Sequence, residues 1–202
     1  MLVLNIIVTA AGFLNYYRAG HFSLRLLLPF VLTSIPAAFL GGMIVLPPKI
    51  FSGILGLTLL AAGLRFLLLT RPVRTGPSLG PAVAYGVGLP TGFALGLLAG
   101  LVGVGGGIFL SPLLLILGWA DAKKTAAVSA AFILLNSMSG LAAHVLWKTP
   151  DWGMLLPLAA AALIGGQIGS WWGAWRIPPL KLQQLLGVVL LVASIKLIRE
   201  LF

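Results

Sequence analysis

The chain has 202 residues, of which 60% are hydrophobic and only 8% are charged. A soluble domain needs far more polar surface, and the apolar runs are long and repeated, so the composition indicates a polytopic helical membrane protein. The stretches of alternating polarity typical of a transmembrane β-barrel do not occur. The chain has no cysteine, which excludes disulfides and thiolate metal sites.

Thirteen Lys and Arg residues against three acids give a formal charge of +10. The basic residues lie mostly between the apolar runs, where they control topology and contact lipid headgroups. We therefore expect the lipid bilayer, and no nucleic acid, as the partner of this basic chain. A second interpretation, attraction of an anionic solute, stays open.

Three apolar runs precede a basic loop in the first part of the chain. Each is long enough for a membrane span, which takes about 20 residues and at least about 17. Pro36 and the Gly41-Gly42 pair indicate that the second span is kinked and closely packed. Arg65 lies near the end of the third span, where its side chain is expected to snorkel to the interface. The predicted spans are residues 1–17, 26–46 and 50–69.

The longest uncharged stretch, residues 80–117, contains a glycine-rich sequence. As one helix it would be roughly 57 Å long, against a hydrocarbon core of about 30 Å. Hydrocarbon cannot hydrogen-bond to exposed peptide groups, so a helix can break at this depth only where protein or a wet cavity covers the break. We therefore predict a broken-helix hairpin with arms at residues 82–102 and 108–117 and the break at residues 103–107.

An internal repeat relates the two ends of the chain. A shift of 131 positions places Asn5 on Asn136 and Arg65 on Lys196, and the register slips by three where Leu28-Pro29 aligns with Leu156-Pro157. The hairpin has no first copy in this chain. With the hairpin, each copy crosses the membrane an odd number of times, so the repeats are inverted, as in many secondary transporters. The predicted divisions are residues 1–70, the end of the first repeat; 71–81, a basic loop; and 82–202, the second repeat, with the hairpin and three spans at 125–147, 153–175 and 182–197.

The fold class predicted is therefore all-α, a polytopic transmembrane helical bundle with incomplete inverted repeats and a glycine-rich broken-helix hairpin. Eight basic residues fall on one predicted face and four on the other, which makes the first face cytoplasmic. Lys123 and Lys124 belong to the first face and are expected to precede a span as orientation determinants.

The glycine-rich break is the candidate ligand-binding site of the sequence. Glycines permit positive φ, so successive N–H groups can form an anion-binding nest, and the second arm presents a helix N-terminus. The alternative is that the glycines only let helices touch. Ser129 and Asn136, seven residues apart, lie close to one helical face, where the amide of Asn136 can bind an ion or make an interhelical hydrogen bond. The candidate substrate-binding residues are Gly103, Gly105, Gly106, Gly107, Ser111, Ser129 and Asn136.

No Asp or Glu lies inside a predicted span, and the two histidines and few acids make no plausible catalytic dyad or metal cluster. We therefore expect no enzyme activity, no cofactor and no metal. Gln167 is a weaker candidate for the polar site.

The glycine-rich sequence, residues 100–114, resembles the signature of the sulfite exporter TauE/SafE family of membrane transporters. Residues 126–129 and 135–140 look like the next helix of that family, and residues 165–173 like its following glycine-rich helix. The resemblance implies a multi-pass protein of a bacterial-type plasma membrane that moves small anions, such as sulfite or organosulfonates, by alternating access.

Members of that family usually carry the glycine-rich segment in both repeats, whereas this chain begins at what resembles the third element of the first repeat. We expect either that an N-terminal part was lost or left out, or that a partner subunit or a homo-oligomer completes the site. Two alternatives to a secondary transporter therefore stay open: a non-transporting or partner-dependent membrane subunit, and an anion channel.

Overall fold

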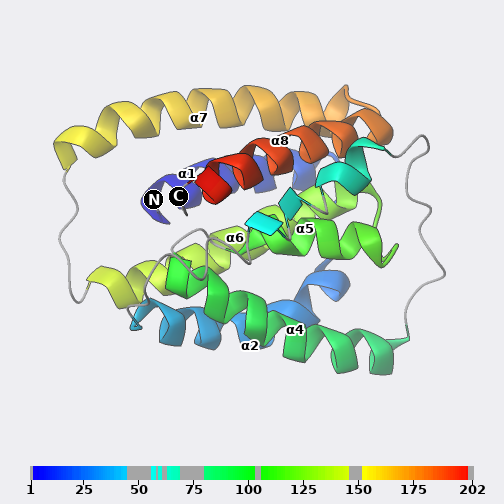
Figure 1. Ribbon diagram of the computed structural model, residues 1–202, viewed down its shortest axis with the longest axis horizontal. Helices are drawn as coiled ribbons and strands as arrows, with labels where there is room; N and C mark the ends of the chain where they lie inside the picture. The colour runs from blue at the N-terminus through cyan, green and yellow to red at the C-terminus, as the bar shows by residue number, and fades with distance from the viewer. Residues whose placement is uncertain are drawn as a thin grey trace.

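The protein is an all-α bundle, as predicted, with no strand among the residues that the structure describes. The computed structural model describes residues 2–44, 56–57, 59–60, 63–68, 80–102, 106–145 and 152–199. Its helices lie lengthwise side by side (Figure 1). They are α1 (Leu2–Arg18), α2 (Leu24–Gly42), α4 (Pro81–Val102), α5 (Gly107–Ile116), α6 (Ala122–Val145), α7 (Trp152–Trp175) and α8 (Pro179–Arg199).

Four stretches of these helices are long and apolar enough to cross a membrane, counting the described residues alone. They are Leu24–Gly42, Ala82–Leu101, Ala122–Ala143 and Pro179–Leu197. The two arms of the predicted hairpin are separate helices, α4 and α5, which agrees with the break inferred from length. Half of the predicted span at residues 50–69 lies outside the described residues. Of those that are described, residues 56–57, 59–60 and 63–67 are helical.

The start of α6 differs from the prediction, because the helix begins at Ala122 rather than at residue 125. The carboxylate of Asp121 accepts a hydrogen bond from the backbone N–H of Lys124 at 2.8 Å, which is the contact of a helix-capping side chain. Lys123 and Lys124 therefore lie in the first turn of α6 and do not precede it. Lys123 and Lys124 limit the apolar run, whereas the capping residue Asp121 marks where the helix itself begins.

Helix α2 packs directly against the backbone of α4 through glycines at every fourth position. A Cβ atom on Gly92 would lie 2.8 Å from Cα of Phe30, and one on Gly96 would lie 2.7 Å from the carbonyl carbon of Ser34. Distances this short are not seen between real side chains and backbone, so only glycine fits. The close packing predicted for α2 is confirmed. The stripe consists of Gly88, Gly92, Gly96 and Gly100 and meets Pro29, Phe30, Ser34 and Ala38 in the same order, so the two helices are parallel.

Helix α6 contacts α1 and α2, while α1 also contacts α7. Leu2, at the start of α1, lies against Gly140, near the end of α6. Tyr16, near the end of α1, shares a buried cluster with Ala127, near the start of α6. Helices α1 and α6 are therefore antiparallel. The relation of their sequences as repeats remains a prediction.

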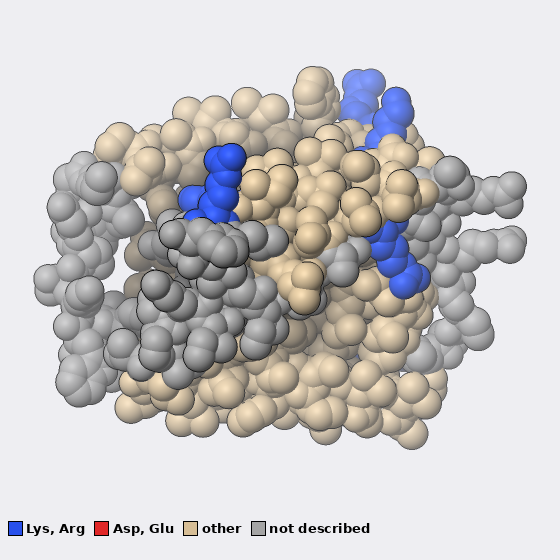
Figure 2. All heavy atoms as spheres, in the orientation of Figure 1, with Lys and Arg blue, Asp and Glu red and all other residues tan. Residues whose placement is uncertain are grey.

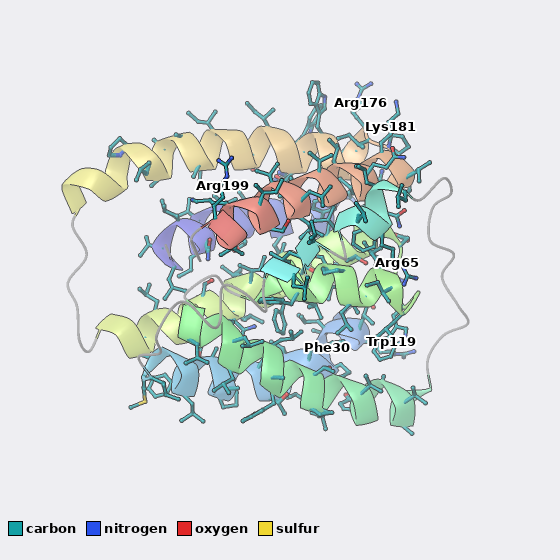
Figure 3. The ribbon with its side chains drawn as sticks, in the orientation of Figure 1. Phe30, Arg65, Trp119, Arg176, Lys181 and Arg199 are labelled. Atoms are coloured by element: carbon teal, nitrogen blue, oxygen red, sulfur yellow. The ribbon has the colours of Figure 1, made fainter. Side chains whose placement is uncertain are left out.

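A buried cluster joins α2, α5 and α6 and fixes the second arm of the hairpin against the bundle. Phe30 from α2 and Phe132 from α6 are fully buried, and both pack with Leu110 and Leu114 of α5. The ring of Trp119, which follows α5, lies 6.0 Å from that of Phe30 (Figure 3). Between membrane helices such close contact supplies van der Waals attraction, because lipid is as apolar as the side chains. The cluster thus holds α5 beside α6.

Candidate substrate-binding site

Four of the seven candidate residues lie on two helices in contact with each other, and a fifth directly precedes one of these helices. Gly106 immediately precedes α5, and Gly107 and Ser111 lie on it. Ser129 and Asn136 lie on α6, against which α5 packs. Gly103 and Gly105 lie outside the described residues, so their predicted role is untested.

Gly106 is the N-terminal flanking residue of α5 and has a left-handed conformation, with φ of 69°. A Cβ atom at this position would lie 2.9 Å from Cβ of Ala99 and 3.0 Å from the carbonyl oxygen of Leu95, both on α4. Both the positive φ and the space therefore require glycine. This conformation lets the chain enter α5 while remaining in contact with α4.

The first turn of α5 is pressed against α6 and has no side-chain cap. A Cβ atom on Gly107 would overlap the side chain of Ile133 and lie 3.2 Å from the carbonyl oxygen of Ser129. Gly106 has no side chain that could accept from the first N–H groups of the helix, and no side-chain cap bond is made. Helix N-termini leave N–H groups without intrahelical partners and carry partial positive charge, so this end suits an anion.

The two candidate serines meet between α5 and α6. The hydroxyl of Ser111 donates to Oγ of Ser129 at 2.8 Å. Ser129 is buried, with 4% of its surface exposed. The pair therefore acts as an interhelical contact one turn into α5, and the hydroxyl hydrogen of Ser129 remains available to an acceptor.

Asn136 is the most unusual polar residue of the candidate set. Only 1% of it is exposed, and neither its Nδ2 nor its Oδ1 has a hydrogen-bond partner within the described part of the chain. The alternative of an interhelical hydrogen bond is therefore not seen among these residues. A buried amide without a partner costs about 1–3 kcal/mol, so it usually indicates a ligand or water.

The position of Asn136 follows from its neighbours on α6. One turn earlier, Phe132 and Ile133 lie against Gly106 and Gly107 at the start of α5. One turn later, the Cβ position of Gly140 lies 4.0 Å from Cα of Gly100, near the end of α4. Asn136 thus lies at the level of the break, between the end of one arm and the start of the other.

Basic side chains gather at one end of the bundle. The Nζ of Lys123, at the start of α6, donates to the carbonyl oxygen of Ala174, near the end of α7, at 3.0 Å. Arg176 and Lys181 lie at the same end, whereas Arg199 lies toward the other (Figure 3). The face in Figure 2 is otherwise mostly uncharged and shows no acidic side chain among the described residues.

Two polar features were missed or only weakly indicated by the sequence. Nδ2 of Asn15 donates to Oε1 of Gln167 at 3.1 Å and to Oγ of Ser170 at 2.8 Å, so these residues connect α1 to α7 instead of lying at the break. Arg65 was interpreted only as a snorkelling residue, yet it lines a large cavity beside α4 and α5. No local signal could have shown this, because the cavity walls are far apart in the sequence.

The chain is similar to known proteins that are named as membrane transporters. The family described as "Sulfite exporter TauE/SafE" matches residues 1–197. The "Probable membrane transporter protein y4hK" of Sinorhizobium fredii is 34% identical over 209 residues, covering 98% of this chain and 80% of the relative. The "Probable membrane transporter protein YunE" of Bacillus subtilis is 34% identical over 84 residues, covering 42% of this chain and 31% of the relative. No solved structure matches.

The match over almost the whole chain, the apolar helices and the relatives named as transporters agree with one another. They identify a membrane transporter and not an enzyme. The chain belongs to the sulfite exporter TauE/SafE family.

Proposed function

We propose that this chain is a secondary transporter of small anions, sulfite or an organosulfonate, that works by alternating access. The proposal depends above all on Asn136, a buried amide at the level of the break that has no hydrogen-bond partner among the described residues. Its Nδ2 offers two donors, and the uncapped first turn of α5 offers backbone N–H groups beside it. Together these groups match the oxygens of a small anion.

A site of neutral donors suits transport. Partial charges from amides and a helix N-terminus attract an anion without fixing it as firmly as a buried ion pair would. Transport requires binding that is favourable enough for entry and weak enough for release. Gly106 and Gly107 support this function because, having no side chains of their own, they let the start of α5 lie directly against Phe132 and Ile133 of α6.

The proposed location is a bacterial plasma membrane, with several passes and with the basic end in the cytoplasm. Seven basic residues belong to that end among the described ones, against Lys196 and Arg199 at the other, and such an excess orients membrane proteins. The seven are Arg18, Arg25, Arg65, Lys123, Lys124, Arg176 and Lys181.

The test is uptake of labelled sulfite and methanesulfonate into proteoliposomes that contain the purified chain, with Asn136→Leu as the variant. Loss of one donor to an anion removes about 1.5–3 kcal/mol, so we expect flux at low substrate concentration to fall about 10- to 100-fold. The variant should also be more stable to unfolding by about 1–3 kcal/mol, because it removes a buried amide that has no hydrogen-bond partner among the described residues. Misfolding cannot explain a loss of flux in a protein that has become more stable.

Ser139→Ala is the matched control. Ser139 lies on the same helix one turn from Asn136, and its hydroxyl donates to the carbonyl oxygen of Ile35 at 2.7 Å, so it is occupied elsewhere. We expect its flux to remain within about twofold of the original chain, since it loses about 0.6 kcal/mol of helix contact. Unchanged flux in Asn136→Leu would contradict the proposed site.

The same vesicles separate the alternatives. Uphill accumulation driven by an ion gradient supports a secondary transporter, whereas flux that runs only downhill contradicts it and indicates a channel. Absence of flux in the chain alone, with flux restored by a co-purifying membrane protein, contradicts independent transport and indicates a partner-dependent subunit.

A further inference from the structure

A cavity of about 660 Å³ lies beside the two arms of the hairpin. Its walls come from α4, α5 and the described residues between 57 and 65. Its volume falls in the usual range for pockets that hold small organic molecules, about 300–1,000 Å³. It is not formed by the candidate residues, so it is a separate feature of the molecule.

The lining of the cavity is apolar with one cation. Leu95 of α4 and Phe109 and Leu113 of α5 are typical of its walls, and among the described lining residues only Arg65 is charged. The other polar lining residue, Thr91, donates its hydroxyl to the carbonyl oxygen of Val87 at 2.6 Å. The chemistry of the cavity is therefore one guanidinium beside hydrocarbon.

The cavity extends from the basic end of the bundle toward the break. Arg65 lies at the end where Arg176 and Lys181 are found (Figure 3). The carbonyl oxygen of Leu95 lies 3.0 Å from the Cβ position of Gly106, and the N–H of Phe109 donates to the carbonyl oxygen of Gly106. One part of the wall is thus adjacent to the start of α5, where the anion is proposed to bind.

We propose that this cavity is an outer binding site for an amphiphilic organic anion, whose charged group pairs with Arg65 while its apolar body lies between α4 and α5. This inference rests on the proposed function and narrows its substrate class. A small inorganic oxyanion keeps its hydration and gains nothing from apolar walls, whereas each methylene that enters them gains from leaving water. The planar guanidinium also matches the oxygens of a sulfonate or carboxylate.

The first experiment measures equilibrium binding of linear alkanesulfonates from one to eight carbons, and of sulfite, to the full chain in a neutral detergent. Burial of a methylene contributes about 0.8 kcal/mol, so we expect affinity to rise about fourfold per carbon until the cavity is full. A flat series, or sulfite binding as tightly as octanesulfonate, overturns the proposal. Equilibrium binding does not depend on transport. If affinity rises with alkyl length but the chain shows no flux, the result contradicts the proposed function and leaves the proposed binding site standing.

Variants test the two halves of the site. Arg65→Gln should lower the affinity for every alkanesulfonate about 10-fold or more, the loss of one charge-assisted contact, and Arg65→Lys should restore part of it. Arg25→Gln removes a cation at the same end of the bundle, but Arg25 does not line the cavity and should leave binding unchanged. Equal losses of alkanesulfonate affinity in Arg65→Gln and Arg25→Gln would indicate nonspecific electrostatic attraction and would contradict the proposed site.

Ala94→Phe fills part of the apolar wall from α4, where Ala94 is exposed and lines the cavity. We expect it to weaken octanesulfonate binding while methanesulfonate binding stays within twofold. If the affinities for octanesulfonate and methanesulfonate fall equally, the alkyl group of octanesulfonate does not occupy the cavity.

Phospholipid is the other source of an anionic group with an apolar body. Binding is therefore repeated in nanodiscs of phosphatidylcholine alone and with added phosphatidylglycerol. Competition between phosphatidylglycerol and octanesulfonate, lost in Arg65→Gln, supports a shared anion site. Tight binding of phosphatidylglycerol that octanesulfonate never displaces assigns the cavity to lipid and overturns the proposal.

Discussion

Substitution of Gly92 by alanine tests the packing of α2 against α4. A Cβ atom there would lie 2.8 Å from Cα and from the carbonyl carbon of Phe30, about 0.7–1.2 Å inside the normal separation of carbon atoms. Backbone atoms cannot move aside as a side chain can, so the helices must separate. Overpacking of this kind costs about 1–3 kcal/mol.

Gly86→Ala on the same helix is the matched control, because nothing lies within 4 Å of the Cβ position of Gly86. Alanine is favoured over glycine within a helix by about 0.5–1 kcal/mol, and both variants receive this gain. The difference between the two variants is therefore the packing cost alone, about 1–3 kcal/mol.

The assay is thermal unfolding in detergent, in which each kcal/mol shifts the midpoint by about 2–4 °C for a chain of this length. We expect Gly86→Ala to unfold above the original chain and Gly92→Ala below Gly86→Ala by several degrees. Equal midpoints for the two variants would refute the direct backbone contact between α2 and α4.

Two further predictions concern α6. Asp121→Ala removes the acceptor of the Lys124 N–H and should destabilise the protein by about 0.5–2 kcal/mol, whereas Asp121→Asn should retain most of the stability; equal loss in both, measured by unfolding, would show that the cap is unimportant. A double-mutant cycle of Ser111→Ala and Ser129→Ala should give a coupling free energy of about 0.6 kcal/mol, the average for hydroxyl and amide contacts between membrane helices, and strictly additive losses would contradict the hydrogen bond.

Much of the fold could be predicted because a membrane restricts the structures that a chain can adopt. Apolar runs of about 20 residues mark spans, and an uncharged run too long for one span must break, so α4 and α5 were expected near their observed ranges. The start of α6 was missed because Lys123 and Lys124 interrupted the apolar run, although Asp121 is a typical capping residue.

The candidate site could be predicted only in part. Glycine signalled positions where a side chain cannot fit, and Gly106 and Gly107 are such positions. Whether Asn136 has a hydrogen-bond partner depends on how α4 and α5 pack against α6, so its lack of one among the described residues could not be inferred from the sequence of α6 alone. The same holds for the cavity at Arg65, which exists only after α4 and α5 are placed beside the preceding segment.

The glycine stripe of α4 also determines how the bundle can deform. The four glycines of the stripe bring the backbone of α4 directly against α2, and α4 has no side chains at these positions that could change rotamers to allow sliding. We therefore expect the two helices to move as one rigid body. Helix α5, in contrast, is held to α6 and α2 by the Ser111–Ser129 bond and by the side chains of Leu110 and Leu114, which can repack. The structure thus contains a stiff frame, α2 with α4, and a softer boundary at α5, beside the buried amide.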